Sequence, residues 1–289
     1  MRKIQKIIFP TDFSATAQHA FLYCLQLADR CQAEITLLHV VYPEYEVLDL
    51  PVMATKATHD KLEAARDALQ SFAAFGIHEA ESGGHLSRLP VVQQEVEVGA
   101  TVGIIAKVAD RDEADLIVMG TQGMHNALER TLGSVSTGVV EHAHCPVLVI
   151  PEHARWKPIQ VMAYATDLSH SGTTQIERSI ELMAPFHPVI HVVHVANNGN
   201  SGEDEKKLAE LEAFFNMSTH PTEALQLNFH QLDRDSVTDG LRDFVEYYEV
   251  DLLAMFAPRH NLIERLFTPS ITRKMVFEAP IPILLIKNE

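Results

Sequence analysis

Short apolar runs and longer amphipathic stretches alternate along the chain. Between the apolar runs, hydrophobic residues recur every three or four positions, which predicts helices with one buried face. Parallel strands need crossover connections, so this alternation predicts a parallel sheet with helices on both faces. The apolar runs of the first half, rich in Val, Ile and Leu, are the predicted strands and lie at residues 5–9, 34–41, 91–98, 115–119 and 146–150.

Four helices are predicted between these strands. The first begins at Ser14, a residue type that favours the N-cap position, and the second ends at Gly76, a residue type that favours helix C-termini. The last of the four leads directly into the final strand. The predicted ranges are 14–31, 58–76, 101–113 and 134–145.

The second half of the chain repeats the pattern of the first. The segments IIFPTDFS at residues 7–14 and VMAYATDLS at residues 161–169 are both apolar runs that end in turn residues. The apolar runs that follow carry His39 and His194, which are 155 residues apart, as are the two threonines of the first pair of segments. One module therefore occurs twice in this chain.

Later in each copy the spacing falls to 136 residues, as between Asp115 and Asp251. A short polar segment, PEHARWKP, separates the copies. We therefore predict two domains, residues 1–152 and 157–289, of one α/β fold. Each is expected to be a doubly wound parallel sheet of five strands with helices on both faces.

Composition narrows the classes of partner. Hydrophobic residues make up 46% of the chain, which is typical of a packed globular protein. The formal net charge of −16 excludes nucleic acid and anionic membrane surfaces as general partners, so an anionic ligand needs local backbone donors or a metal. The three cysteines lack metal-ligand spacing, and no apolar run reaches the roughly 18 to 20 residues of a membrane span. We expect a cytoplasmic protein.

Three glycines mark a candidate ligand site in the first half. Gly120 ends a predicted strand, Gly123 follows it, and Gly133 precedes Ser134 at a predicted helix start. Open parallel sheets bind ligands at the carboxyl ends of their strands, and helix N-termini favour phosphate. Glycines allow backbone amides to approach an anion closely. The segment predicts a backbone cradle for a phosphate chain, with ordinary turn glycines as the alternative.

The segments PTDFS and LLHVV, together with the G-x2-G-x9-G-S spacing, resemble the universal stress protein family, in particular its ATP-binding branch, over nearly the whole chain. In that family the adenine lies against the first two strands and the glycine loop holds the ribose and phosphates. The resemblance implies ATP as ligand, with Asp12 facing Mg²⁺ or Mn²⁺ on the phosphates. The residues that it implies for nucleotide binding are Pro10, Thr11, Asp12, Val40, Met119, Gly120, Gln122, Gly123, Gly133, Ser134, Val135 and Ser136.

The second copy departs from this glycine pattern. At the 136-residue spacing Phe256, Arg259 and Pro269 replace the three glycines, and only the serine is kept, as Ser270. Phenylalanine fills the cradle, and proline removes an N–H donor. We expect the second domain to keep the fold and to lose the nucleotide.

Several polar residues have a structural interpretation beside the functional one. Asp12 fits a turn residue as well as a ligand contact. His39 and His194 lie on apolar strands, which favours satisfied core histidines over ligands. His191 and His194 lie three apart on a strand, so they should face opposite sides of the sheet. His142 and His144 lack a second ligand cluster, which argues against zinc.

These features favour a stress-response protein whose first domain binds ATP as a regulatory or sensor module. The sequence lacks the GxxxxGK motif of the P-loop, so fast turnover is not expected. Slow ATP hydrolysis and a nucleotide-independent interaction scaffold stay open as alternatives. The resemblance also implies pairing through the last strand of each domain, as an intramolecular pseudo-dimer and in a possible homodimer, with the protein partner unknown.

Overall fold

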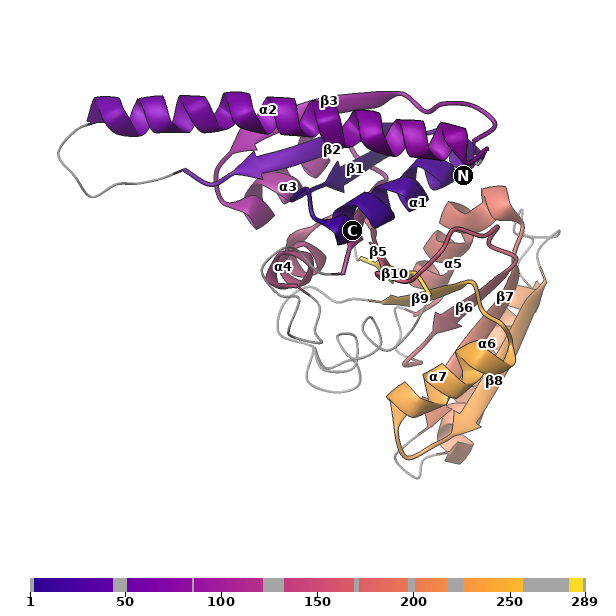
Figure 1. The fold of residues 1–289 in the computed structure, drawn as a ribbon. Helices are drawn as coiled ribbons and strands as arrows, with labels where there is room; N and C mark the ends of the chain where they lie inside the picture. The colour runs from indigo at the N-terminus through magenta and orange to yellow at the C-terminus, as the bar shows by residue number, and fades with distance from the viewer. Residues whose placement is uncertain are drawn as a thin grey trace. The chain divides into compact units, whose positions relative to one another are not determined.

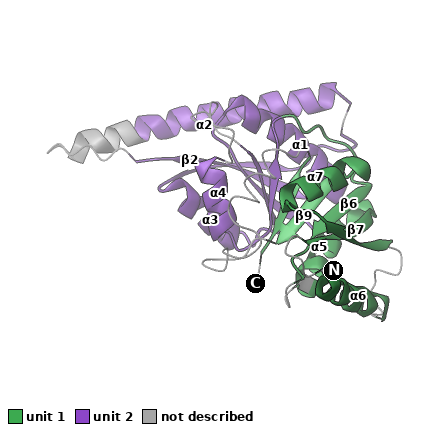
Figure 2. Cartoon of the chain, turned by 90° about the horizontal axis from the view of Figure 1, so that it is seen from below, with its two compact units in different colours: residues 1–3, 153–289 green, residues 4–152 purple. Residues whose placement is uncertain are grey.

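The chain folds into two units of the same α/β type (Figures 1 and 2). The N-terminal unit comprises residues 4–152, and the C-terminal unit comprises residues 153–289 together with 1–3. The coordinates are those of a computed structural model. It describes residues 3–43, 51–84, 86–121, 133–168, 172–196, 201–217, 226–256 and 281–287.

The described strands of the N-terminal unit form a parallel sheet and are β1 (Lys6–Pro10), β2 (Glu34–Val41), β3 (Val92–Val98), β4 (Leu116–Gly120) and β5 (Val147–Ile150). Their order is β3-β2-β1-β4-β5, with every neighbouring pair parallel. Chain order reverses direction between β1 and β4, which makes this the switch point where doubly wound sheets bind ligands. All five strands lie at the predicted positions.

The described helices of the N-terminal unit are α1 (Ala15–Cys31), α2 (Pro51–Ser82), α3 (Thr101–Arg111) and α4 (Ser134–His142). In this unit α1 packs beside α2, and α3 packs beside α4 (Figure 1). The predicted N-cap of the first helix is confirmed, because Ser14 Oγ accepts a hydrogen bond from Ala17 N at 3.1 Å. The third and fourth helices begin as predicted and end two or three residues earlier.

The second predicted helix is wrong at both ends, because α2 begins at Pro51 and continues through Gly76 to Ser82. Glycine is required at position 76 by packing against another helix. A Cβ atom there would lie 2.6 Å from Cδ1 of Phe21 on α1, closer than real contacts allow. Gly76 is therefore the point where α2 approaches α1, and it does not end the helix.

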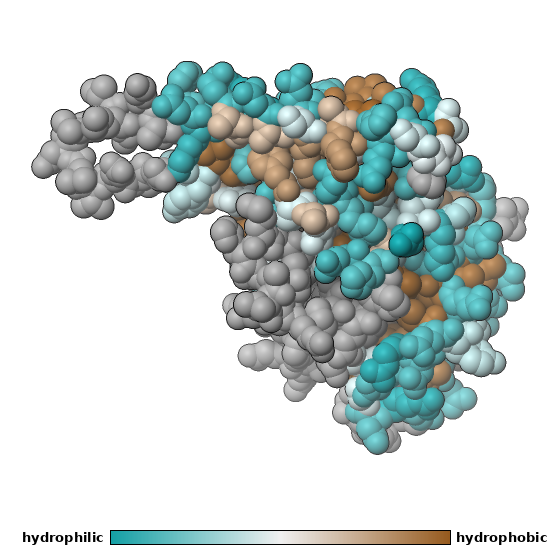
Figure 3. All heavy atoms as spheres, viewed as in Figure 1, coloured by the Kyte–Doolittle hydropathy of each residue, from teal (hydrophilic) through white to brown (hydrophobic). Residues whose placement is uncertain are grey.

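The α2 helix has one buried face, as its periodicity predicts. Leu69, Phe72 and Ala73 are buried, whereas hydrophilic residues cover much of its visible surface (Figure 3). Phe75 of α2 is a large hydrophobic residue with 55% of its area exposed. Among the helices of the described ranges, none combines the length and apolar character needed to cross a membrane.

The described strands of the C-terminal unit are β6 (Val161–Ala165), β7 (Val189–Ala196), β8 (Leu227–Asp233), β9 (Leu252–Phe256) and β10 (Ile283–Ile286). Their order, β8-β7-β6-β9-β10, repeats that of the N-terminal unit, again with parallel neighbours. The predicted doubly wound fold is confirmed in both halves. The described helices are α5 (Gly172–Met183), the short 3-10 helix η1 (Ala184–Phe186), α6 (Ser201–Met217) and α7 (Val237–Tyr247).

The repeat extends to a buried aspartate in each unit. Asp115 Oδ2 accepts hydrogen bonds from Gln5 N and Lys6 N at 2.8 and 3.1 Å. Asp251 Oδ2 does the same for the N–H groups of residues 160–161, at 2.7 and 2.9 Å. Each carboxylate thus fixes the start of the first strand against the fourth strand of its own sheet. Both aspartates sit at the 136-residue spacing that the sequence predicts.

Candidate functional site

The predicted site residues of the first two strands lie at one edge of the N-terminal sheet. Pro10 pairs with Leu38 in the β1–β2 register, and Thr11 N donates to Leu38 O at 2.9 Å. Asp12 follows Pro10 by two residues in the turn after β1, and Val40 follows Leu38 by two residues on β2. Thr11 is buried, while Asp12 and Val40 are half-buried. These residues form the carboxyl edge of the sheet beside the switch point.

The turn that follows β1 is held by its own side chains. Thr11 Oγ1 accepts a hydrogen bond from Phe13 N at 3.0 Å, and Asp12 Oδ1 accepts one from Ser14 N at 3.1 Å. Phe13 has a φ of 64°, an unusual conformation for a bulky residue that these two bonds help to hold. Asp12 therefore serves as a turn residue.

His39 braces this turn from the strand below it. Its Nδ1 lies 2.8 Å from Thr11 O, and because a carbonyl only accepts, Nδ1 carries the proton. The Phe13 ring stacks on the imidazole with centroids 4.3 Å apart and planes inclined by 26°. His39 is hydrogen-bonded, as predicted, but it is half-buried and does not lie in the core.

Gly120 lies at the end of β4 and packs against the start of α1. A Cβ atom there would meet Thr16 Cγ2 at 3.2 Å and Thr16 O at 3.4 Å, so the position is tight for any larger residue. Ser136 Oγ donates to Gly120 O at 3.0 Å, which ties the first turn of α4 to the end of β4. Because this hydroxyl hydrogen is engaged, Ser136 can offer a ligand its backbone N–H but not its O–H. Met119, one residue earlier, is buried.

The start of α4 presents backbone donors at the same edge. Gly133 is the N-cap, and Thr137 N makes the first helical bond, to Gly133 O at 2.9 Å. The N–H groups of residues 134–136 precede that bond and have no acceptor within the helix. The first turn contains no acidic residue, and Ser134 and Val135 are exposed. This is the arrangement that favours anions at a helix N-terminus.

The segment between Thr121 and Gly133 is closed at its base, because Gly133 N donates to Thr121 O at 2.8 Å. The residue after β4 and the N-cap of α4 are therefore joined by a backbone hydrogen bond. Two of the predicted nucleotide-binding residues, Gln122 and Gly123, lie outside the described residues.

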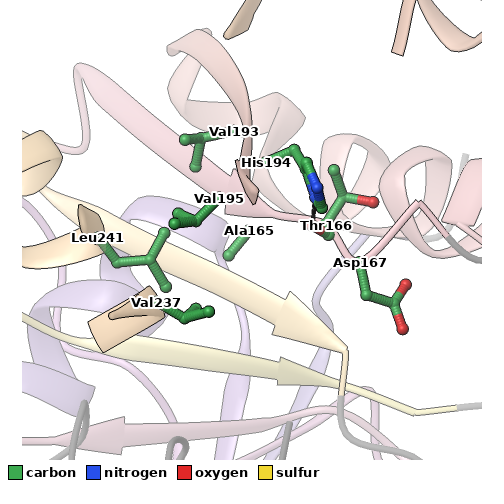
Figure 4. Close-up of a pocket in the computed structure, with 8 residues that line it drawn as sticks. All are labelled: Ala165, Thr166, Asp167, Val193, His194, Val195, Val237 and Leu241. Atoms are coloured by element: carbon green, nitrogen blue, oxygen red, sulfur yellow. Dashed lines mark hydrogen bonds between the residues drawn. The ribbon is translucent and has the colours of Figure 1, made fainter. Parts of the chain in front are cut away.

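The C-terminal unit reproduces the turn after its first strand. Thr166 N donates to Val193 O at 2.9 Å, and Thr166 Oγ1 accepts from Leu168 N at 3.1 Å. Leu168 has a φ of 56°, and His194 Nδ1 lies 2.9 Å from Thr166 O. Each contact has its counterpart 155 residues earlier. His194 is the buried core histidine that the sequence predicts, with Nδ1 hydrogen-bonded (Figure 4), but its buried Nε2 makes no hydrogen bond.

The two units differ at the end of the fourth strand. Phe256 ends β9 at the position that Gly120 takes in β4. It pairs with Ile286 as Gly120 pairs with Ile150, so the register supports the alignment. The substitutions Arg259 and Pro269, and the retained Ser270, lie outside the described residues.

The sequence did not predict an imidazole pair in the C-terminal unit. His191 Nδ1 lies 2.8 Å from His230 Nε2 on the neighbouring strand, and both rings pack on Tyr248 beyond α7. Burial lowers the pKa of both histidines, and in His191 the nearby His230 lowers the pKa further. On the opposite face His194 Nε2 lies 3.4 Å from Asp204 of α6, so the prediction that His191 and His194 face opposite sides is confirmed.

Comparisons with known proteins match both halves of the chain to one family. The model of the universal stress protein family matches residues 3–151 and 158–287. A putative universal stress protein of Staphylococcus epidermidis is 33% identical over 156 residues, which cover 52% of this chain and 86% of that protein. A universal stress protein of Methanocaldococcus jannaschii is 31% identical over 148 residues, which cover 50% of this chain and 81% of that protein. The crystal structure of a universal stress protein from Archaeoglobus fulgidus covers 100% of both chains with a TM-score of 0.72 at 17% identity, a likeness of fold alone.

Proposed function

The chain belongs to the universal stress protein family, and we propose that its N-terminal unit binds ATP as a regulatory or sensor module in the stress response. The observation that carries this proposal is the meeting of two features at the switch point of one sheet. The first is the braced turn at residues 10–12, and the second is the N-terminus of α4, tied to Gly120 through Ser136.

Each feature suits one end of the nucleotide. Pro10 and Val40 offer apolar contact for a base beside the acceptor oxygens of Asp12. The N–H groups of residues 134–136 offer donors and the positive end of the helix dipole to phosphates. Because the chain as a whole carries a charge of −16, these local donors have to outweigh the general repulsion of a polyanion.

A divalent cation fits the same arrangement. Mg²⁺ is held by one or two carboxylates together with substrate phosphates, and when bound it neutralises phosphate charge. Asp12 is the carboxylate at this edge that would face it, with one oxygen already fixed by Ser14 N. The turn thus holds the carboxylate in place before any ligand arrives.

Binding, not turnover, is the role that this site supports. Its donors are backbone groups, and the sequence has no P-loop lysine. A ligand that binds only the folded state at a hundredfold excess over Kd stabilises it by about 2.7 kcal/mol. ATP occupancy can therefore bias the N-terminal unit between two conformations or two partners.

Native mass spectrometry of the full chain with Mg-ATP tests the proposal. We expect one adenine nucleotide per chain, and its loss in Gly123→Arg, which installs the residue found at position 259 of the second copy. The matched control, Arg259→Gly, should leave one nucleotide per chain. A chain without nucleotide and without a thermal shift in Mg-ATP would contradict ATP binding and favour the scaffold. Phosphate release at about 1 per second or faster would favour an enzyme.

A further inference from the structure

A short stretch of chain, residues 151–158, joins β5 to β6, and we call it the linker. Its last part is held by Asp251, whose side chain is only 8% exposed. Oδ1 of this carboxylate lies 2.6 Å from Nζ of Lys157, while Oδ2 accepts the backbone N–H groups of residues 160–161, where β6 begins. One buried carboxylate thus fixes both the linker and the strand that follows it.

The middle of the linker is held as well. Trp156 meets the ring of Phe186 on η1 edge to face, with centroids 6.2 Å apart and planes inclined by 61°. Ala154 is buried, with 3% of its area exposed. Phe186 and Asp251 both belong to the C-terminal unit, as does the chain from residue 153 onwards. The greater part of the linker is therefore bound to that unit and is not a free tether.

The other end of the linker begins beside the candidate nucleotide site. Ile150, the last residue of β5, pairs with Gly120 in the β4–β5 register. Ser136 Oγ donates to the carbonyl of Gly120, so the first turn of α4, the end of β4 and the end of β5 form one connected row. Pro151 follows directly; it is buried, and its ring fixes φ. A displacement of the α4 N-terminus therefore reaches the first residue of the linker.

Residues 152 and 153 separate the two held parts of the chain. Both are exposed and lie in a turn. A flexible linker of a dozen residues would absorb a small movement in its many torsions. Here a movement at Pro151 has to be taken up by the torsions of two residues or passed on to the contacts of Trp156 and Lys157.

We propose that the linker transmits nucleotide occupancy of the N-terminal unit to the C-terminal unit. This inference rests on the proposed function, since it needs a ligand at the N-terminus of α4. Phosphate binding selects one arrangement of α4 and the end of β4, and the linker contacts on Phe186 and Asp251 shift with it. A ligand moves such an equilibrium only by its difference in affinity for the two arrangements, so the linker contacts and the nucleotide influence each other. The second copy, which has lost the glycine pattern, then serves as the output of the first.

Trp156 is the single tryptophan of the chain, so its fluorescence reports on the linker directly. Mg-ATP is titrated into the full chain, and calorimetry measures binding independently. We expect a saturable change in Trp156 emission with the Kd of the calorimetric titration. The exchange rates of the Gln160 and Val161 amides, which bond to Asp251, should change by about twofold or more.

The two possible failures are distinct in this experiment. Nucleotide binding without a change in Trp156 emission or in amide exchange would overturn the inference and leave the proposed function intact. A chain that binds no nucleotide would contradict both.

A matched pair of substitutions tests the ion pair. Lys157→Gln changes a side chain that is 55% exposed, so the chain should fold and bind one nucleotide. Its Trp156 response to Mg-ATP should be smaller by about twofold or more, because one of the linker contacts is lost. The control Lys207→Gln removes an exposed ion pair with Glu203 in the same unit and should leave the response unchanged. Equal responses in the two variants would contradict the role of the linker contact.

An insertion tests the path along the chain. Two glycines placed after residue 152 lengthen the exposed turn and leave the described contacts of both units in place. Nucleotide should bind as before, while the Trp156 response should disappear, because the longer turn absorbs the displacement. A full response in this variant would show that the signal does not pass through the linker.

Discussion

The turns after β1 and β6 share their hydrogen bonds to a threonine and a histidine, whereas the ends of β4 and β9 differ. Both turns have a threonine hydroxyl that accepts from the residue two positions on, a residue with positive φ, and a histidine bonded to the threonine carbonyl. Gly120 and Phe256 then separate the two copies. Bonds that hold the fold have been kept in both halves, so the turn by itself says little about a ligand. The proposal of a phosphate site therefore rests on the glycine positions of the first copy.

A second difference lies on the outer strands. In the N-terminal unit Arg111 makes two hydrogen bonds of 2.7 Å to Glu95 on β3, and it also pairs with Asp112. In the C-terminal unit the corresponding strand position carries His230, which bonds to His191. One fold thus tolerates an ion-pair network or a half-buried imidazole pair at the same place. The two arrangements are expected to respond differently to acid.

The largest effect on ligand affinity is expected from a substitution that makes the end of β4 identical to the end of β9. Gly120→Phe should lower the affinity for Mg-ATP at least 100-fold, because the side chain enters the space beside Thr16 and the start of α4. Calorimetric titration measures the change. The reverse change, Phe256→Gly, should not create an ATP site, since Arg259 and Pro269 remain. Unchanged ATP affinity in Gly120→Phe would contradict the idea that this glycine distinguishes the two halves in ligand binding.

A smaller effect, on stability, is expected from removing the histidine contact that both turns share. His39→Ala and His194→Ala each leave a turn carbonyl without its donor, at a cost of about 1–3 kcal/mol in the free energy of unfolding. The loss should be greater for His194, which is 5% exposed, than for the half-buried His39. Urea titrations should follow methyl signals of each unit separately, because a two-unit chain need not unfold in one step. His→Gln, whose amide can donate, should restore part of the loss, and equal costs at both sites would contradict the role of burial.

The smallest expected effect is a difference in acid sensitivity. The pKa values of His191 and His230 are lowered from 6.5 in the folded protein, so the unfolded chain binds these protons more readily. Their contribution to stability is complete above pH 6.5 and is lost as pH falls below that value. The pKa of Glu95 is lowered from 4.5, chiefly by its hydrogen bonds from Arg111, so that contribution is lost only below pH 4.5.

Between pH 6.5 and 4.5, therefore, the urea midpoint of the C-terminal unit should fall more than that of the N-terminal unit. Methyl signals of the two units measure both midpoints in one sample. His230→Gln should reduce the difference. Equal losses in the two units over this range would show that the imidazole pair does not set the acid response.

The sequence predicted what depends on local periodicity. The buried strands of the N-terminal unit are continuous apolar runs, and the predicted ranges match the structure to within about a residue at each end. The local sequence predicts a helix end at Gly76, because glycine is typical of helix C-termini. Its actual role depends on Phe21 of another helix, which no local pattern shows. The His191–His230 contact depends on the register of β7 and β8, which a polar strand such as LNFHQLD does not specify.

In the candidate site, too, local sequence predicts contacts between adjacent residues but not contacts between distant ones. Residues of the turn after β1 were predicted because they are adjacent in sequence. The bond from Ser136 to the carbonyl of Gly120 joins a helix to a strand end across 16 residues, so its use of the hydroxyl was not predicted. The nucleotide-binding roles of all these residues stay predictions, and Gln122 and Gly123 also lie outside the described residues.

The hydrogen bond between Gly133 N and Thr121 O joins the two ends of an eleven-residue insert, residues 122–132. Because both anchor points belong to the scaffold, evolution can lengthen, shorten or replace this insert with little cost to the sheet. Exchanging this segment between members of the family should therefore leave every described strand of the sheet in place.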